Sequence, residues 1–180
     1  FLNENYSPID LKEIPKEYTH NDGRTIEIHE KVAPFLENLF ANAKADGLSL
    51  RALSSYRSFK TQTSLKAQNT VVYGIGANRF SADQGYSEHQ LGTTVDFTTT
   101  SSNGVLGKFE GTKEYEWMTE NAYKYGFILS YPKNNSYYIF EPWHWRFVGV
   151  ALATKLHRDK MNFYDMDQRE IDEYLLTIFD

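Results

Sequence analysis

The chain has 180 residues, of which 41% are hydrophobic and 16% aromatic, so it is long enough to bury a sizeable core and too apolar to be disordered. Its formal net charge is −5 and no basic stripe runs along it, which argues against nucleic acid as a partner. Because cysteine is absent, disulfides, thiolate catalysis and cysteine-based zinc sites are excluded, and a metal would need histidine, aspartate or glutamate ligands.

Local patterns predict helices and strands that do not follow a regular βαβ alternation. In its first half, the sequence predicts a turn at 20–24, a helix over 30–46 that ends at Gly47, a strand at 48–55, a helix that begins near 58, a long ordered loop at 73–88 and a strand at 93–99. In its second half, it predicts a helix over 112–126, strands at 127–131, 137–140 and 144–148, and an amphipathic helix over 167–179 with Asp167 as its N-cap. This mixture indicates an α+β single domain with a central, mainly antiparallel sheet flanked by helices.

The stretch SEHQLGTTVDF, residues 87–97, is the first candidate for a functional site. His89 and Asp96 would lie roughly 23 Å apart on an extended chain, which is too far for two ligands of one ion. Gly92 could form a tight turn between them, and the β-branched residues after it predict a strand that carries Asp96 back beside His89.

The stretch EPWH, residues 141–144, supplies a third possible ligand in His144. Two imidazoles and one carboxylate leave a fourth tetrahedral position for water, which is typical of a catalytic zinc site. Pro142 fits the start of a strand or a bulge, which would let Glu141 converge on the same site as a general base. Each residue alone has an ordinary structural interpretation, but their joint pattern favours a zinc centre.

These motifs, together with YGFILSYP and EPWHWRFVG, resemble the VanY-type D-alanyl-D-alanine carboxypeptidase family, a branch of the zinc peptidases that includes D-Ala-D-Ala dipeptidases and hedgehog domains. The resemblance runs from about Leu53 to Gly149. It implies the fold of that group and one zinc ion per chain, held by His89, Asp96 and His144. It also implies that Glu141 is the catalytic base. The motif-bearing core is expected at about 48–150, with residues 1–29 and 160–180 as flanking segments.

The resemblance also gives a role to SSYRSFKTQ, residues 54–62. It implies that Arg57 contacts the substrate near the scissile bond and that Gln62 helps to hold it. A guanidinium suits this role because its planar fork can bind a terminal carboxylate or an oxyanion. Ser87 is expected to hydrogen-bond the substrate, while Tyr86 and Trp143 are expected to line the pocket.

The expected activity is that of a zinc-dependent D,D-carboxypeptidase that removes the terminal D-alanine from peptidoglycan stem peptides. Three alternatives remain: an L,D-carboxypeptidase acting on tetrapeptide stems, a D-Ala-D-Ala dipeptidase, and a non-catalytic zinc-binding module. The retained Glu141 and Arg57 speak against the last of these. The sequence does not choose between D,D and L,D specificity.

The expected setting is extracytoplasmic, in a bacterial cell envelope, since such substrates are assembled outside the membrane. No apolar run approaches the ~18 residues that a membrane span needs. The chain begins at Phe1, so we expect that a signal or an anchor preceded it. A monomer is expected.

Overall fold

The computed structural model describes residues 2–73, 82 and 85–179. The predicted loop at 73–88 therefore lies largely outside the described residues. The helices are α1 (Ala33–Ala45), α2 (Phe59–Tyr73), α3 (Lys113–Asn121), α4 (Val150–Asp159) and α5 (Gln168–Leu175). Short 3₁₀ helices are η1 (Lys16–Tyr18), η3 (Glu88–Leu91), η4 (Leu106–Gly111), η5 (Ala122–Tyr125) and η6 (Phe163–Asp165).

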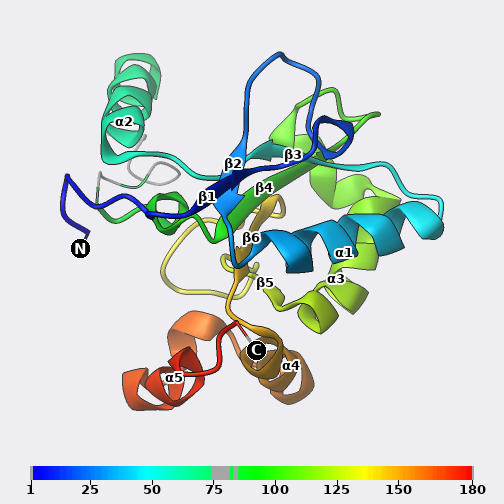
Figure 1. Cartoon of the computed structure of the whole chain (residues 1–180), viewed down its shortest axis with the longest axis vertical. Coiled ribbons are helices and arrows are strands. Elements are labelled where there is room, and N and C mark those ends of the chain that lie inside the picture. The colour runs from blue at the N-terminus through cyan, green and yellow to red at the C-terminus, as the bar shows by residue number, and fades with distance from the viewer. Residues whose placement is uncertain (1, 74–81, 83–84, 180) are drawn as a thin grey trace.

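A four-stranded antiparallel sheet forms the centre of the molecule (Figure 1). Its strands, in spatial order, are β3 (Leu50–Ser54), β4 (Thr94–Thr99), β6 (His144–Phe147) and β5 (Phe127–Leu129). A separate antiparallel pair is formed by β1 (Leu11–Glu13) and β2 (Glu27–His29). The prediction of an α+β domain with a central antiparallel sheet flanked by helices is confirmed.

The two faces of the central sheet differ in chemistry. Along β4, Val95 and Phe97 enter the hydrophobic core, which α1 and α3 cover on one side of the sheet (Figure 1). Side chains alternate along a strand, so Asp96 points to the opposite face. On β6 the same alternation sends Trp145 into the core and turns His144 away from it. Polar residues of the two central strands thus share one face.

The turn between η3 and β4 is made by Gly92, as the sequence predicts. Its φ is +71°, in the left-handed region that favours glycine. A Cβ at this position would lie 3.3 Å from Cγ of Pro8 and 3.4 Å from the backbone nitrogen of His29. The close approach of the N-terminal segment therefore adds a second reason for glycine here.

Two parts of the predicted secondary structure differ from the structure. Residues 137–140 do not form a strand; the side chain of Asn135 accepts hydrogen bonds from the backbone N–H groups of Tyr137 and Tyr138, and these donors are lost to any sheet ladder. Helix α4 was not predicted. Its stripe is short, with Leu152, Ala153 and Leu156 as its buried residues.

The C-terminal part forms a second, smaller hydrophobic cluster. The cluster contains Val148, Leu152, Ala153, Leu156, Phe163 and Met166. Asp167 caps α5 by accepting a hydrogen bond from the backbone N–H of Arg169, which confirms the predicted N-cap. Residues after 160 therefore pack onto the remainder of the chain, through α4 and the end of β6 (Figure 1).

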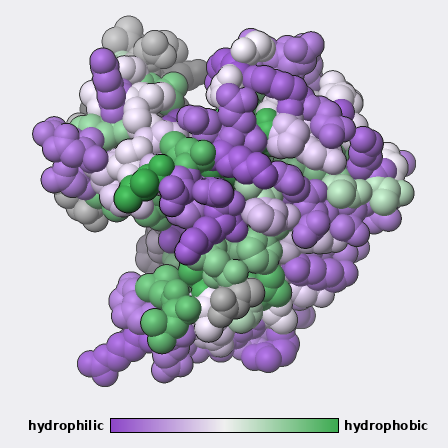
Figure 2. Space-filling model, viewed as in Figure 1, coloured by the Kyte–Doolittle hydropathy of each residue, from purple (hydrophilic) through white to green (hydrophobic). Residues whose placement is uncertain are grey.

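The surface is mainly polar on the face shown in Figure 2, where hydrophobic residues gather only in small patches. Leu175 and Leu176, at the end of α5, are among the exposed large hydrophobic side chains. Within the described residues, no helix combines the length and the apolar character that crossing a membrane requires.

Candidate metal centre

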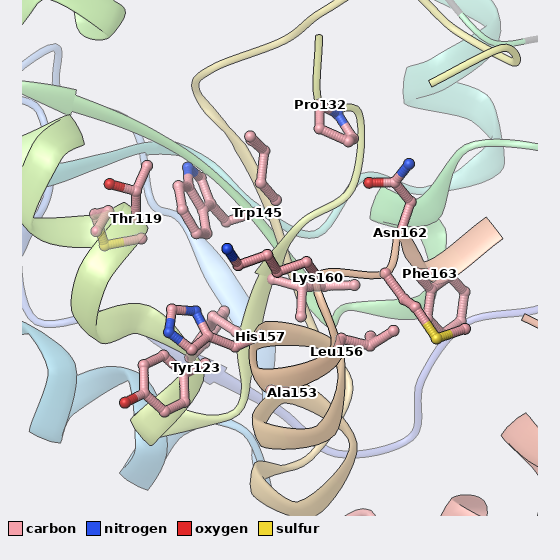
Figure 3. A pocket seen from close by; sticks show the side chains of 15 residues that line it. Thr119, Tyr123, Pro132, Trp145, Ala153, Leu156, His157, Lys160, Asn162 and Phe163 are labelled. Carbon is pink, nitrogen blue, oxygen red and sulfur yellow. The ribbon is translucent and has the colours of Figure 1, made fainter. Parts of the chain in front are cut away.

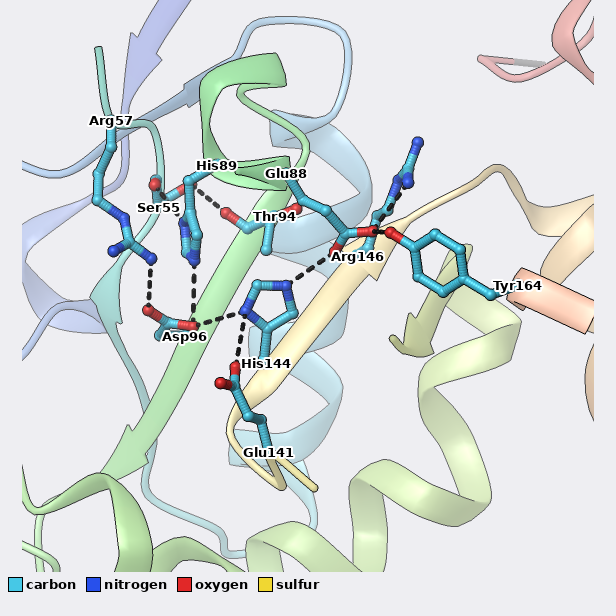
Figure 4. A network of polar contacts seen from close by, with 10 residues as sticks. All are labelled: Ser55, Arg57, Glu88, His89, Thr94, Asp96, Glu141, His144, Arg146 and Tyr164. Atoms are coloured by element: carbon cyan, nitrogen blue, oxygen red, sulfur yellow. Dashed lines mark hydrogen bonds and ion pairs between the residues drawn. The ribbon is translucent and has the colours of Figure 1, made fainter. Parts of the chain in front are cut away.

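Three possible metal ligands converge on the polar face of the sheet (Figure 4). The Oδ1 atom of Asp96 lies 3.3 Å from Nε2 of His89 and 3.3 Å from Nδ1 of His144. One ligand atom from each residue lies within 4.8 Å of the others, and all three residues are buried. The structure thus brings together the three ligands that the sequence predicts.

The register of the sheet explains this convergence. Asp96 on β4 and His144 on β6 are direct cross-strand partners, so their side chains project side by side from the same face. His89 lies on η3, and the turn at Gly92 returns the chain so that its imidazole faces Asp96. Two strands and one turn therefore position the three donors.

Hydrogen bonds fix which nitrogen of each histidine faces the centre. Nδ1 of His89 lies 2.6 Å from the backbone carbonyl oxygen of Ser55, to which it donates, so Nε2 is left with a lone pair. In His144 the roles are reversed: Nε2 donates to Oε2 of Glu88 at 2.8 Å, and Nδ1 faces Asp96. The two rings present opposite nitrogens and meet edge to face, with centroids 4.9 Å apart.

The two histidines differ in proton affinity. Burial and the positive charge of Arg57 lower the pKa of His89 to about 4. Burial alone would lower the pKa of His144 as well, but the neighbouring carboxylates of Asp96 and Glu88 raise the pKa to about 9. For Asp96, burial is outweighed by both histidines and Arg57, which hold the pKa of its carboxyl well below the usual value. Asp96 is therefore ionised at neutral pH, as a carboxylate metal ligand must be.

In the part of the chain that the structure describes, two of the three donor atoms lack hydrogen-bond partners, which is what a metal site requires. Nε2 of His89 and Oδ1 of Asp96 are buried, yet neither has a hydrogen-bond partner among the described residues. Buried polar atoms usually have such partners, so two orphans facing each other indicate an intended ligand. Two imidazoles and a carboxylate are donors that zinc accepts.

Glu141 and Arg57 flank the three donors (Figure 4). Glu141 lies in the turn that leads into β6, and its Oε2 is 3.5 Å from Nδ1 of His144. This turn, closed by a hydrogen bond from the backbone N–H of His144 to the carbonyl of Glu141, gives the convergence predicted from Pro142. Arg57 follows β3 and donates from Nη2 to Oδ2 of Asp96 at 3.2 Å. Its buried Nε has no described partner.

The protonation of Glu141 suits acid–base chemistry. Burial raises the pKa of its carboxyl to about 7, and the neighbouring carboxylates of Asp96 and Glu88 act in the same direction, against His144 and Arg57. A group with a pKa near neutral can both accept and return a proton at working pH. Glu141 is therefore the carboxyl in this cluster best placed for proton transfer.

The other predicted site residues lie in different settings. Gln62 is buried and donates to the carbonyl of Ala82, while its Oε1 has no described partner. Ser87 is buried at the start of η3, and Tyr86 is 61% exposed. Trp143 is half-buried and packs against the hydrophobic core. Their predicted contacts with a substrate stay predictions.

Glu88 was missed by the sequence reasoning. It is buried, and its carboxylate accepts hydrogen bonds from His144, Arg146 and Tyr164. Periodicity gives no signal for it. The available signal is charge: Glu88 directly precedes the predicted ligand His89, and Arg146 lies two residues after His144, both in segments that are otherwise buried.

A separate cavity of about 290 Å³ lies away from this centre (Figure 3). Trp145, which follows His144 on β6, faces it from the other side of the sheet, and Tyr123, His157 and Lys160 contribute polar groups. Its lining contains no carboxylate among the described residues. The cavity therefore takes no part in the cluster of metal donors.

Sequence comparison places this site in a known family. The family model for VanY, D-alanyl-D-alanine carboxypeptidase, matches residues 25–150. The putative carboxypeptidase YodJ of Bacillus subtilis (strain 168) is 36% identical over 161 residues, which cover 83% of this chain and 57% of the relative. A D-alanyl-D-alanine carboxypeptidase of Enterococcus faecalis is 32% identical over 170 residues, or 87% of this chain and 58% of the relative. The chain thus spans less than two thirds of the length of both curated relatives.

Solved structures agree with the sequence matches. The LdcB LD-carboxypeptidase superposes with a TM-score of 0.81 at 33% identity, covering 97% of this chain and 80% of the other. A variant of the vancomycin resistance D,D-pentapeptidase VanY in complex with Zn(II) gives a TM-score of 0.74 at 27% identity, covering 97% and 93%. On the match of the family model over more than half of its residues, the chain belongs to the VanY D-alanyl-D-alanine carboxypeptidase family.

Proposed function

We propose that the chain is a zinc-dependent D,D-carboxypeptidase that removes the terminal D-alanine from peptidoglycan stem peptides. The observation that carries the proposal is the convergence of Nε2 of His89, Oδ1 of Asp96 and Nδ1 of His144, with Glu141 3.5 Å from the last of these. One zinc ion per chain would be held by these three atoms. The VanY structure with bound Zn(II) supports the choice of metal.

The residues of this chain divide the chemistry between them. A zinc ion held here would supply Lewis-acid activation of a water molecule and of the scissile carbonyl. Glu141 takes the proton of the attacking water and delivers it to the leaving amine. Arg57 is anchored on Asp96, and its partly exposed guanidinium would bind the terminal carboxylate or the oxyanion.

The choice of D,D specificity rests on relatives. The E. faecalis relative is named a D-alanyl-D-alanine carboxypeptidase, and a solved structure of VanYB, 29% identical to this chain, contains D-alanine-D-alanine. Gln62, Ser87, Tyr86 and Trp143 complete the proposed substrate contacts. Both relatives point to a peptide that ends in D-alanine with a free carboxylate, and the proposed reaction cuts the last peptide bond before that carboxylate.

A second candidate function is favoured by one observation. The LdcB neighbour, which has the higher TM-score of the two structures compared above, is an LD-carboxypeptidase. An enzyme of that type would cut a tetrapeptide stem between its L and D residues. The proposed metal centre and base would serve either reaction, so the two candidates differ in substrate and not in mechanism.

The remaining proposals concern the setting of the protein. We propose that it acts on stem peptides in the cell envelope, as an extracytoplasmic monomer. We also propose that residues 1–180 form a single functional domain, because the segment after 160 packs against α4 and Tyr164 reaches the carboxylate of Glu88.

Synthetic peptides with mass spectrometry test the proposal. The zinc-loaded protein is incubated with a stem pentapeptide ending in D-Ala-D-Ala, with the same peptide amidated at its C-terminus, and with the tetrapeptide. We expect release of one D-alanine from the free pentapeptide and little cleavage of the amidated one, because Arg57 then has no carboxylate to bind. Cleavage of the tetrapeptide alone would move the assignment to the L,D class, and release of the D-Ala-D-Ala dipeptide would point to another mode of cleavage.

A further inference from the structure

The ring of His144 is held in a cage that extends well beyond the metal donors (Figure 4). Tyr131 stacks on one of its faces, with centroids 4.6 Å apart and planes inclined by 27°. At its outer edge, Nε2 donates to Oε2 of Glu88 at 2.8 Å. The imidazole is thus restrained both in the tilt of its plane and in its rotation about Cβ–Cγ.

Glu88 is itself fixed by partners on its other oxygen. Its Oε1 accepts from Nη1 of Arg146 at 2.9 Å and from the hydroxyl of Tyr164 at 2.6 Å. Arg146 stands two residues after His144 on β6, so it projects from the same face of the sheet. With both oxygens engaged, the carboxylate has one orientation, and that orientation presents Oε2 to His144.

Two of the groups behind this arrangement come from the C-terminal segment. Tyr164 and Phe163 lie in η6, beyond residue 150, where the match to the family model ends. The guanidinium of Arg146 lies over the ring of Phe163, 4.8 Å from its centroid. The segment therefore contacts both members of the Glu88–Arg146 pair.

We propose that Glu88 is a positioning residue for the metal ligand His144, and that Tyr164 extends this control to the C-terminal segment. The hydrogen bond from Nε2–H selects the tautomer in which Nδ1 carries the lone pair, and the carboxylate increases the basicity of that nitrogen. Loss of such an outer partner typically weakens metal binding by about 10–100-fold. This inference rests on the proposed zinc centre.

Zinc affinity, measured by competition with a chromogenic chelator, tests the inference without a substrate. Glu88→Gln keeps the size and an acceptor oxygen but removes the charge, and we expect its zinc dissociation constant to rise by about 10-fold or more. Tyr164→Phe removes a single hydroxyl, and we expect a smaller rise of a few-fold. Tyr137→Phe is the matched control, because its hydroxyl donates to Asp165 in the same aromatic cluster and not to Glu88.

The outcomes separate this inference from the proposed function. A wild-type protein that binds no zinc would refute the metal centre itself. If the wild type binds zinc and Glu88→Gln binds it within two-fold of the wild type, Glu88 has no positioning role. If Tyr164→Phe matches Tyr137→Phe, the C-terminal segment has no part in it. Should Glu88→Gln fail to fold by circular dichroism, Tyr164→Phe decides alone, since it keeps the ring packing and removes one hydrogen bond to Glu88; a zinc dissociation constant equal to that of Tyr137→Phe would then overturn the whole proposal.

Discussion

His89 and His144 have pKa values shifted in opposite directions, although the centroids of their rings lie only 4.9 Å apart. His89 is held by a neutral carbonyl and has a pKa lowered to about 4, while His144 lies between two carboxylates and has a pKa raised to about 9. Both must be neutral to bind a metal. Only His144 must therefore give up a proton to the solvent near neutral pH when the ion enters.

This difference predicts a pH dependence for the protein stripped of metal by a chelator. In the unfolded chain His144 titrates near 6.5, and in the folded protein its pKa is about 9. Its protonated form thus contributes stability that is complete below pH 6.5 and is lost as the pH rises through 9. We expect the free energy of unfolding to fall by ~2–3 kcal/mol between pH 7 and 9, above the range in which His89 titrates.

Urea denaturation at several pH values measures this change. The zinc-loaded protein is the control: its His144 is already neutral, so its stability should not fall over the same interval. A flat profile for the stripped protein would show that His144 holds no extra proton in the folded state.

Glu141 allows a prediction about turnover. Glu141→Gln keeps the shape of the side chain but removes its ability to accept a proton, so we expect the rate of D-alanine release to fall by about 10²–10⁴-fold. Zinc content should stay near one equivalent, because Glu141 is not among the three proposed ligands. Glu120→Gln, on an exposed carboxylate of α3, is the control for a general charge effect. A Glu141→Gln protein with the wild-type rate would remove Glu141 as the base.

At the scale of elements, the geometry of the centre depends on the junction of η3, Gly92 and β4. The sequence predicts this junction well, because a glycine followed by β-branched residues is a local signal. This junction explains the proposed ligands His89 and Asp96, and the EPWH stretch adds His144, since chemistry restricts which residues can bind a metal. Glu88 and Tyr164 could not be predicted in this way, because their contact joins segments that only the tertiary fold brings together.

The errors in the predicted elements have similar causes. The strand expected at 137–140 was lost to a side chain, that of Asn135, which captures two backbone donors. The sequence does not predict helix α4, because its short stripe packs in a cluster with more distant residues such as Phe163, and because its end, KLHRDK, resembles a solvated segment. In both places the contact that determines the secondary structure involves a side chain, and the hydrophobic periodicity of the segment does not reveal it.

Gly92→Ala tests the junction. A left-handed backbone costs a non-glycine residue roughly 1–2 kcal/mol, and the new methyl group would press on Cγ of Pro8. We expect urea denaturation to show a loss of stability of about that size, together with weaker zinc binding, because β4 carries Asp96. Gly107→Ala is the matched control, since nothing lies within 4 Å of a Cβ there. Equal effects of the two substitutions would contradict a special role for the turn.

At the scale of the whole molecule, the second hydrophobic cluster connects the C-terminal segment to the sheet. Gly149 marks the crossing point: its φ is +84°, and a Cβ there would lie 2.8 Å from the backbone oxygen of Ile178. The backbone at Ile178 therefore packs directly against the residues that follow β6. Changes in this cluster should reach the metal centre only where a side chain contacts Arg146 or Glu88.

Phe163 and Leu152 provide the comparison, since both belong to the second cluster. Phe163→Ala removes a buried ring, at a cost of about 3–5 kcal/mol, and also the ring beneath Arg146. Leu152→Ala should cost about 2–5 kcal/mol without touching that pair. Under conditions where both variants are folded, we expect weaker zinc binding for Phe163→Ala and wild-type binding for Leu152→Ala. If the two variants had identical zinc dissociation constants, the ring of Phe163 beneath Arg146 would have no specific effect on the metal centre.

The register that pairs Asp96 with His144 also has a consequence for how the sheet opens. An ion held by residues 89, 96 and 144 ties together three segments and closes a long chain loop, much as a covalent cross-link would. Local opening of β4 away from β6 must then break coordination as well as hydrogen bonds. In hydrogen–deuterium exchange, the amides of β4 and β6 should therefore exchange faster once the ion is chelated, while those shared by β1 and β2, which carry no ligand, should keep their rate.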